Sequence, residues 1–161
     1  MKKLKSLVIV SVSALFLAFN TSAAPAKKAT SKKESAVEMA LVSQAVSINV
    51  ENRQLSVDSN GQALAVFKYV VTNIGNKPIS AVQWLNAYVH QREVIHNQDM
   101  NVELTSPLMP GNSLSINLQI PFVQIQEKFR PVFMDSQSKI DVYPIDRIIR
   151  FSDQKMLYER Q

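Results

Sequence analysis

Residues 114–122 read Leu-Ser-Ile-Asn-Leu-Gln-Ile-Pro-Phe, with an apolar side chain at every second position. Successive side chains of a β-strand point to opposite faces of its sheet. This period of two therefore predicts a strand with one face against an apolar core and the other in water. It is the clearest strand signal in the chain, and it places Leu118 inward and Gln119 outward.

Strand patterns of related kinds occur on the N-terminal and C-terminal sides of this stretch. Residues 46–50 alternate in the same way. Residues 63–72 are apolar on both faces except at Lys68, which is typical of a central strand. Residues 79–89 form a second long β-rich stretch, and residues 148–151 indicate a last strand.

A polar stretch at residues 96–99 separates apolar residues at 94–95 and 102–104, and it predicts the corner of a hairpin. Turn-forming residues at 59–61, 73–78 and 107–111 divide the other strands. About seven short strands with this spacing predict an all-β fold, an immunoglobulin-like antiparallel β-sandwich.

Two stretches of the predicted sandwich resemble a known family. Residues 69–79 with Val82 are similar to the strand, turn and strand that open the bacterial immunoglobulin-like domains of the FxLYD type. Residues 108–113 are similar to the turn that precedes an alternating strand in those domains, so the resemblance covers about residues 62–122. It implies an extracytoplasmic binding or spacer module and carries over no active site.

The N-terminus has the three parts of a Sec-type signal peptide. Lysines at positions 2, 3 and 5 precede an uncharged apolar stretch at 7–19, and small residues follow at 21–24. The apolar stretch is shorter than the roughly 20 residues that span a bilayer, so no stable membrane insertion is expected. We predict a signal peptide at 1–23, cleavage within 23–26, and a periplasmic or secreted product. No cysteine is present, which excludes lipoprotein processing.

Residues 24–36 contain Ala, Lys, Ser and Thr but no large apolar side chain, which predicts a flexible spacer. Its lysines leave a second interpretation open, a tether to anionic lipid headgroups. These lysines are Lys27, Lys28, Lys32 and Lys33. Residues 37–161 are then the sandwich domain, and good helix formers at 35–44 indicate one or two helical turns before the first strand.

The charge of the chain is concentrated near its N-terminus. The whole chain holds 18 Lys and Arg against 13 Asp and Glu, but from residue 45 onward there are 11 of each. Binding to phosphate groups needs a basic face on the folded domain. Nucleic acid is therefore excluded as a partner.

The chain lacks the patterns that carry common catalytic chemistry. It has no Cys, no Gly-x-Ser-x-Gly, and only 3 Gly, which cannot build a phosphate-binding loop. Asp135, Asp141 and Asp146 are expected to be solvated surface acids. We therefore expect a protein that is not an enzyme, has no catalytic residues and needs no cofactor.

The sharpest chemical pattern is formed by His90 and His96, with Met100 and Met109 behind them. Imidazole and thioether groups together suit copper in an oxidising compartment. The spacing matches no metal motif, so no metal ligand is assigned. The other interpretation is a pair of exposed hairpin histidines.

These observations favour an exported, non-enzymatic binding or accessory module that contacts another envelope protein through a sheet edge or an aromatic face. Trp84 and Tyr88 lie on one face of their strand, where Trp84 either fills the core or belongs to an exposed patch. Two alternatives stay open. One is a metal carrier using His90, His96 and Met100, and the other is a subunit of a surface assembly in which an edge strand accepts a neighbour's strand.

Overall fold

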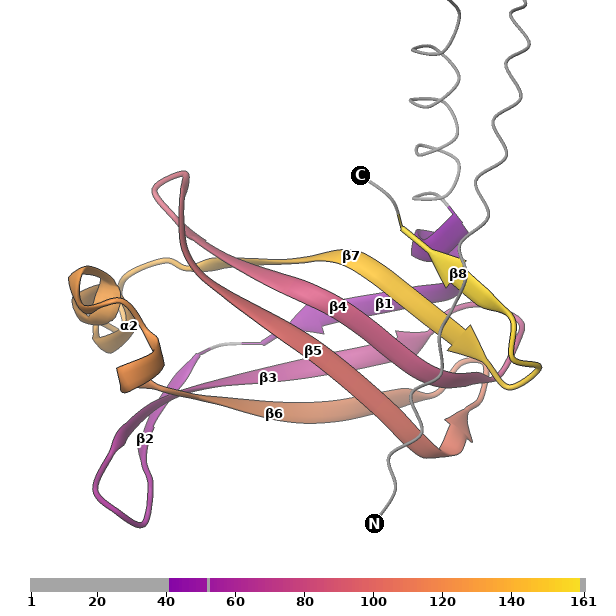
Figure 1. Cartoon of the computed structure of the whole chain (residues 1–161), viewed down its shortest axis with the longest axis horizontal. Coiled ribbons are helices and arrows are strands. Elements are labelled where there is room, and N and C mark those ends of the chain that lie inside the picture. The colour runs from indigo at the N-terminus through magenta and orange to yellow at the C-terminus, as the bar shows by residue number, and fades with distance from the viewer. Residues whose placement is uncertain (1–40, 52, 160–161) are drawn as a thin grey trace, which may run out of the picture.

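The computed structural model describes residues 41–51 and 53–159, which form two antiparallel β-sheets packed face to face (Figure 1). The strands are β1 (Val46–Val50), β2 (Gln54–Val57), β3 (Ala63–Asn73), β4 (Ile79–His90), β5 (Glu93–Leu108), β6 (Ser113–Pro121), β7 (Asp141–Phe151) and β8 (Met156–Tyr158). In the first sheet, β3 lies between β6 and the pair β1 and β2. The second sheet has the order β5-β4-β7-β8. The expected immunoglobulin-like β-sandwich is confirmed.

The core lies between β3 and β4, the central strands of the two sheets. Phe67 and Tyr69 of β3 are buried and face Trp84 and Tyr88 of β4. The ring centroids of Phe67 and Tyr88 are 4.9 Å apart, and those of Tyr69 and Trp84 are 6.0 Å apart. Lys68 is the one charged residue of β3, and it faces away from the core and forms an ion pair with Glu51. The prediction of a central strand at residues 63–72 is therefore confirmed.

The alternating stretch that predicted a strand is β6, an edge strand that pairs with β3 alone among the described strands. Ile120 is fully buried, and Ile116 and Leu118 pack partly buried against the core. Asn117 and Gln119 are exposed on the other face. The period of two gave the correct inward and outward assignments because one face of this strand is in water.

A helical cap follows β6 and closes one end of the sandwich. It consists of η1 (Phe122–Gln124), η2 (Glu127–Phe129) and α2 (Arg130–Met134). Its buried side chains are Phe122, Ile125, Phe129 and Phe133. The Phe133 ring lies 6.3 Å from that of Phe67 and 6.1 Å from that of Tyr88, so the cap extends the aromatic core.

The hairpin corner predicted at residues 96–99 is wrong. The turn lies earlier, where Gln91 and Arg92 adopt positive φ values, and β5 runs unbroken from Glu93 to Leu108. Polar residues occur within this strand for two reasons. Asn97 and Asp99 are exposed on its outer face, whereas His96 and Gln98 face the inward residues Tyr88 and Asn86 across the strand pair.

Residues 41–45 are helical and lead into β1, in agreement with the helical turns expected before the first strand. The signal peptide, its cleavage site and the spacer at 24–36 lie outside the described residues. Among the described helices, none has the length and apolar character needed to cross a membrane.

Candidate binding groove

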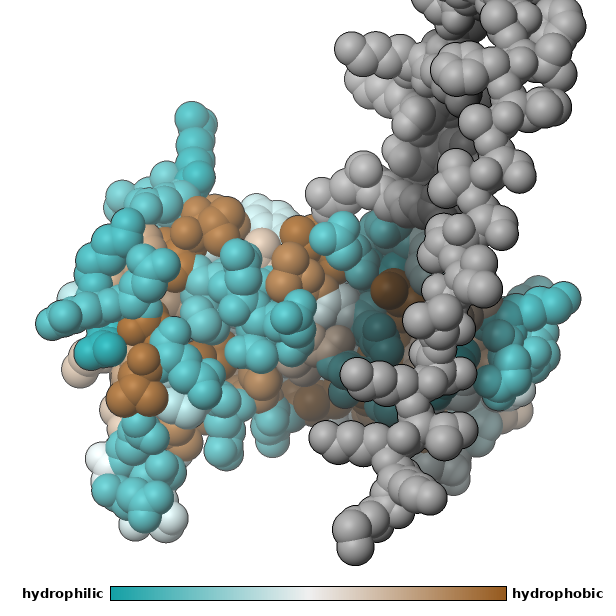
Figure 2. Space-filling view, viewed as in Figure 1, coloured by the Kyte–Doolittle hydropathy of each residue, from teal (hydrophilic) through white to brown (hydrophobic). Residues whose placement is uncertain are grey.

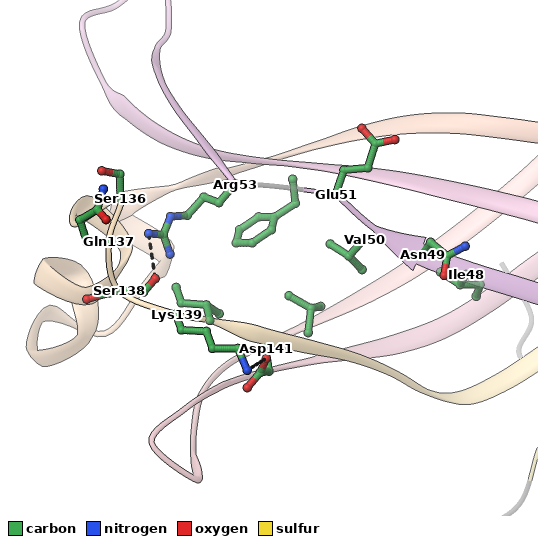
Figure 3. Close-up of a pocket in the computed structure, with 13 residues that line it drawn as sticks. Ile48, Asn49, Val50, Glu51, Arg53, Ser136, Gln137, Ser138, Lys139 and Asp141 are labelled. Atoms are coloured by element: carbon green, nitrogen blue, oxygen red, sulfur yellow. Dashed lines mark hydrogen bonds and ion pairs between the residues drawn. The ribbon is translucent and has the colours of Figure 1, made fainter.

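Two incomplete strand pairings leave a groove between the sheets. β8 pairs with β7 only at Ile148–Arg150, so no described strand lies on that side of residues 141–145. β1 pairs with β3 on one side, and no described strand lies on its other side. A groove of about 730 Å³ lies between these two open edges (Figure 3). We call it the edge groove.

The floor of the edge groove is apolar. Phe67 of β3 lines it together with Ile48 and Val50 of β1, and Ile140 and Val142 line it from the opposite side. Phe67 is 2% exposed, whereas Val50, Ile140 and Val142 are only partly buried. Phe67 and Ile48 are thus buried beneath, while Val50, Ile140 and Val142 are partly accessible here because no strand covers them. An added strand would bury them further.

Arg53 closes one end of the edge groove. Its guanidinium donates hydrogen bonds to the backbone carbonyls of Asp135 and Ser138. Figure 3 shows the bond to Ser138. Burial lowers the pKa of Arg53, and the nearby Asp135 carboxylate acts in the opposite direction. The side chain therefore joins the start of β2 to the loop that follows α2.

The loop at residues 135–139 is held by its own polar groups. The Asp135 carboxylate accepts hydrogen bonds from the Ser138 hydroxyl at 2.7 Å and the Gln137 N–H at 3.0 Å. These two contacts are the main causes of its lowered pKa. Lys139 forms an ion pair with Asp141 at 2.9 Å, which raises the pKa of Lys139. The rim of the groove is therefore polar, and hydrogen bonds within the loop tie Asp135 to Gln137 and Ser138.

The two edges of the groove differ as partners for an added strand. Pro144 of β7 has no N–H, and Asp146 has a left-handed φ of 51° at a register shift. Proline and bulges are devices that protect sheet edges from pairing. The 5 residues of β1 contain neither feature. The groove therefore offers its more continuous hydrogen-bonding edge along β1.

The aromatic pair singled out in the sequence does not form an exposed patch. Trp84 is 3% exposed and Tyr88 is fully buried. The Trp84 indole donates to the Asn86 side-chain oxygen at 2.8 Å, and the hydroxyls of Tyr69 and Tyr88 pair. The core interpretation of Trp84 is confirmed. The interpretation as an exposed aromatic surface is wrong because β3 covers this face.

The residues of the copper hypothesis occupy different surroundings. The His90 Nδ1 contacts the Lys139 carbonyl at 2.8 Å at the end of β4, whereas His96 packs against the rings of Tyr88 and Phe133. Met100 is opposite Trp84 in the core, and Met109 is exposed in the loop after β5. Within residues 41–51 and 53–159, no group of 3 or more His, Cys, Asp or Glu is placed to hold a metal ion.

Sequence reasoning did not identify Arg53, Phe67 or the loop at 135–139 as parts of a site. Asp135 and Asp141 were expected only as surface acids, and both are at the groove rim. No local pattern joins these residues, because the groove depends on β1 and β7 lying side by side at the sandwich edge.

No family model matches the chain, and no curated protein matches it. Among solved structures, it is similar to an uncharacterized lipoprotein, yajI, from Escherichia coli, determined by NMR in solution. The two share 14% sequence identity over 84% of this chain and 87% of the other, with a TM-score of 0.30.

Proposed function

We propose that this chain is an exported, non-enzymatic binding module that takes an extended segment of another envelope protein into the edge groove. The carrying observation is the groove between the open edges of β1 and β7, with Phe67 in its floor. An extended peptide gains main-chain hydrogen bonds from an open edge and specificity from apolar contacts at alternate side chains. The resemblance of residues 62–122 to FxLYD-type domains supports the same extracytoplasmic role.

The signal-peptide pattern of residues 1–24 supports export to the periplasm or beyond. The intact mass of the protein in the periplasmic fraction tests this part of the proposal. A product that lacks the residues up to a position within 23–26 is expected. An uncleaved chain that sediments with the membrane would contradict it.

Site-specific photo-crosslinking in the intact envelope tests the groove. A benzophenone amino acid replaces Asn49, which is exposed at the open edge of β1, or Gln137, which is exposed in the loop across the groove. The matched control replaces Asn117, which is exposed on the outer face of the first sheet. We expect adducts to one envelope protein from positions 49 and 137 and none from 117. Equal labelling from all three positions, or none from 49 and 137, would contradict the proposal.

The surface-assembly alternative uses the same open edges. The identity of the protein cross-linked at positions 49 and 137 distinguishes it from binding to a different envelope protein. If the groove accepts a strand from a second copy of this chain, the cross-linked species contains two copies. Sedimentation of the purified protein would then show assembly that increases with concentration.

A further inference from the structure

The second sheet presents an apolar outer face that is separate from the edge groove. Tyr143 of β7 is 51% exposed, and Met156 and Tyr158 of β8 are 45% and 40% exposed. Strand register places Ile145 beside Leu85 and Ile148 beside Tyr158, on the side opposite the buried core residues. These residues form what we call the outer face of the second sheet: Leu85, Tyr143, Ile145, Ile148, Met156 and Tyr158. In the view of Figure 2, apolar side chains reach the surface in separate patches among hydrophilic ones.

A hollow of about 340 Å³ on this face lies between two carboxylates. Leu85 and Ile148 line it together with Asp99 of β5 and Asp146 of β7. Asp99 pairs directly across the strand from Leu85, and Asp146 follows Ile145, the other neighbour of Leu85. The hollow therefore has apolar contacts at Leu85 and Ile148, polar ones at Gln83 and Asn101, and one acid on each side.

These two acids differ from the other acids of the same face. Glu103 is paired with Arg150, and Asp141 is paired with Lys139. For Asp99 and Asp146, no ion pair occurs among the described residues. The face therefore has excess negative charge at the hollow, although residues 45–161 have equal numbers of acidic and basic residues.

A bulge in β7 places Asp146 at the hollow. The register against β4 moves from Leu85–Ile145 to Gln83–Ile148, which leaves Asp146 and Arg147 opposite Trp84 alone. Arg147 binds Glu159, whereas Asp146 is exposed at the hollow with a φ of 51°. Bulges of this kind redirect side chains within a sheet. Here the bulge lets Asp146 face the hollow although Ile145 before it already faces outward, and Arg147 is held by Glu159 instead.

We infer that the outer face of the second sheet binds a protein segment that presents a lysine or arginine flanked by apolar side chains. The aliphatic part of such a side chain covers Leu85 and Ile148, and its charged end lies between Asp99 and Asp146. The flanking apolar residues contact Tyr143 and Tyr158. This surface and the edge groove use different residues, so either inference can fail without the other.

Selection of random short peptides on the purified protein tests this inference directly. We expect enriched sequences to contain Lys or Arg next to apolar residues. Their affinity should fall by about tenfold or more in the Asp99→Asn, Asp146→Asn double variant and fall as salt is added. Both substitutions conserve shape at exposed positions, and Asn tolerates a left-handed φ.

Glu127→Gln is the matched control, because Glu127 is an exposed acid on the helical cap and should leave affinity unchanged. Tyr143→Ser should weaken the same peptides without changing their salt dependence. The inference is wrong if no sequence is enriched, if the enriched sequences lack a basic residue, or if the double variant binds them equally well.

Discussion

The hydroxyls of Tyr69 and Tyr88 lie 2.7 Å apart and join the two sheets in the middle of the core. Both residues are fully buried. Removing one hydroxyl leaves the other without its partner in an apolar environment, which costs about 1–3 kcal/mol. We expect Tyr69→Phe and Tyr88→Phe each to lower the free energy of unfolding by this amount.

The double Phe variant should be less destabilised than the sum of the two single variants, because it leaves no orphaned hydroxyl. Urea unfolding of the four proteins measures this coupling. Strict additivity would show that the two hydroxyls do not depend on each other.

Stability should fall at alkaline pH. Burial is the largest cause of the raised pKa of both tyrosines, and the pKa of Tyr69 is raised to about 12. Because the folded state favours the protonated tyrosine, this group stabilises the fold fully at pH values below 10, the ordinary pKa of tyrosine. The contribution is lost as the pH rises towards 12, the pKa of Tyr69 in the folded state. The measurement is the unfolding midpoint at a series of pH values from pH 8 upward, about two units below the ordinary pKa of tyrosine. The midpoint should decline for the wild type and decline less for the double Phe variant.

His96 should make the domain less stable in mild acid. Burial lowers its pKa, and a contact with Gln98 acts in the opposite direction. Its Nε2 atom is buried without a hydrogen-bond partner among the described residues. A base with a depressed folded-state pKa favours folding above its ordinary value of 6.5 and loses this contribution below it. His96→Gln should flatten this part of the stability profile, and an unchanged profile would contradict the assignment.

Glu159 should be needed to hold β8 in place. Its carboxylate accepts hydrogen bonds from the Arg147 side chain at 2.6 and 2.8 Å and from the Arg147 N–H at 3.1 Å. Burial acts to raise the pKa of Glu159, but these contacts lower it overall. Glu159→Gln should cost about 3 kcal/mol, as expected when one partner of a largely buried pair is removed. Amide exchange should accelerate first at Met156–Tyr158, with β3 as the slowly exchanging control.

Leu118→Asp and Gln119→Asp should have opposite outcomes although the residues are adjacent. Leu118 packs against the core, whereas Gln119 is exposed. An unpaired carboxylate on the inward side costs several kcal/mol, a large part of the stability of a domain of this size. Thermal unfolding should show a strong loss for the first variant and little change for the second. Equal midpoints would show that β6 does not use this register.

The strand at residues 114–122 was predicted correctly because one face of β6 is exposed to solvent and the other packs on the core. Its side chains therefore alternate between polar and apolar along the sequence. The helical cap was not predicted, although Phe122, Ile125, Phe129 and Phe133 recur every three or four residues, which is a helical period. β5 was divided incorrectly because His96 and Gln98 face partners on another strand. That pairing cannot be read from the residues that flank them.

The two candidate surfaces were less accessible to prediction than the fold. Both depend on strands brought together from distant parts of the chain. The edge groove joins Phe67 to Val142, and the hollow joins Asp99 to Asp146. Alternation assigns a residue to a face of its own strand, but it does not say which strand lies beside it or where a bulge changes the register.

Arg147 contacts Ser43 at 3.0 Å as well as Glu159, so one side chain joins the helical residues before β1 to the end of β8. Figure 1 shows these two regions at the same end of the sandwich. The domain is therefore suited to circular permutation, with residues 41 and 159 joined by a short linker. New ends could open at the exposed Ser59–Gly61 turn, which joins β2 to β3. Such a permutant would keep every strand pairing and leave the edge groove clear of both chain ends.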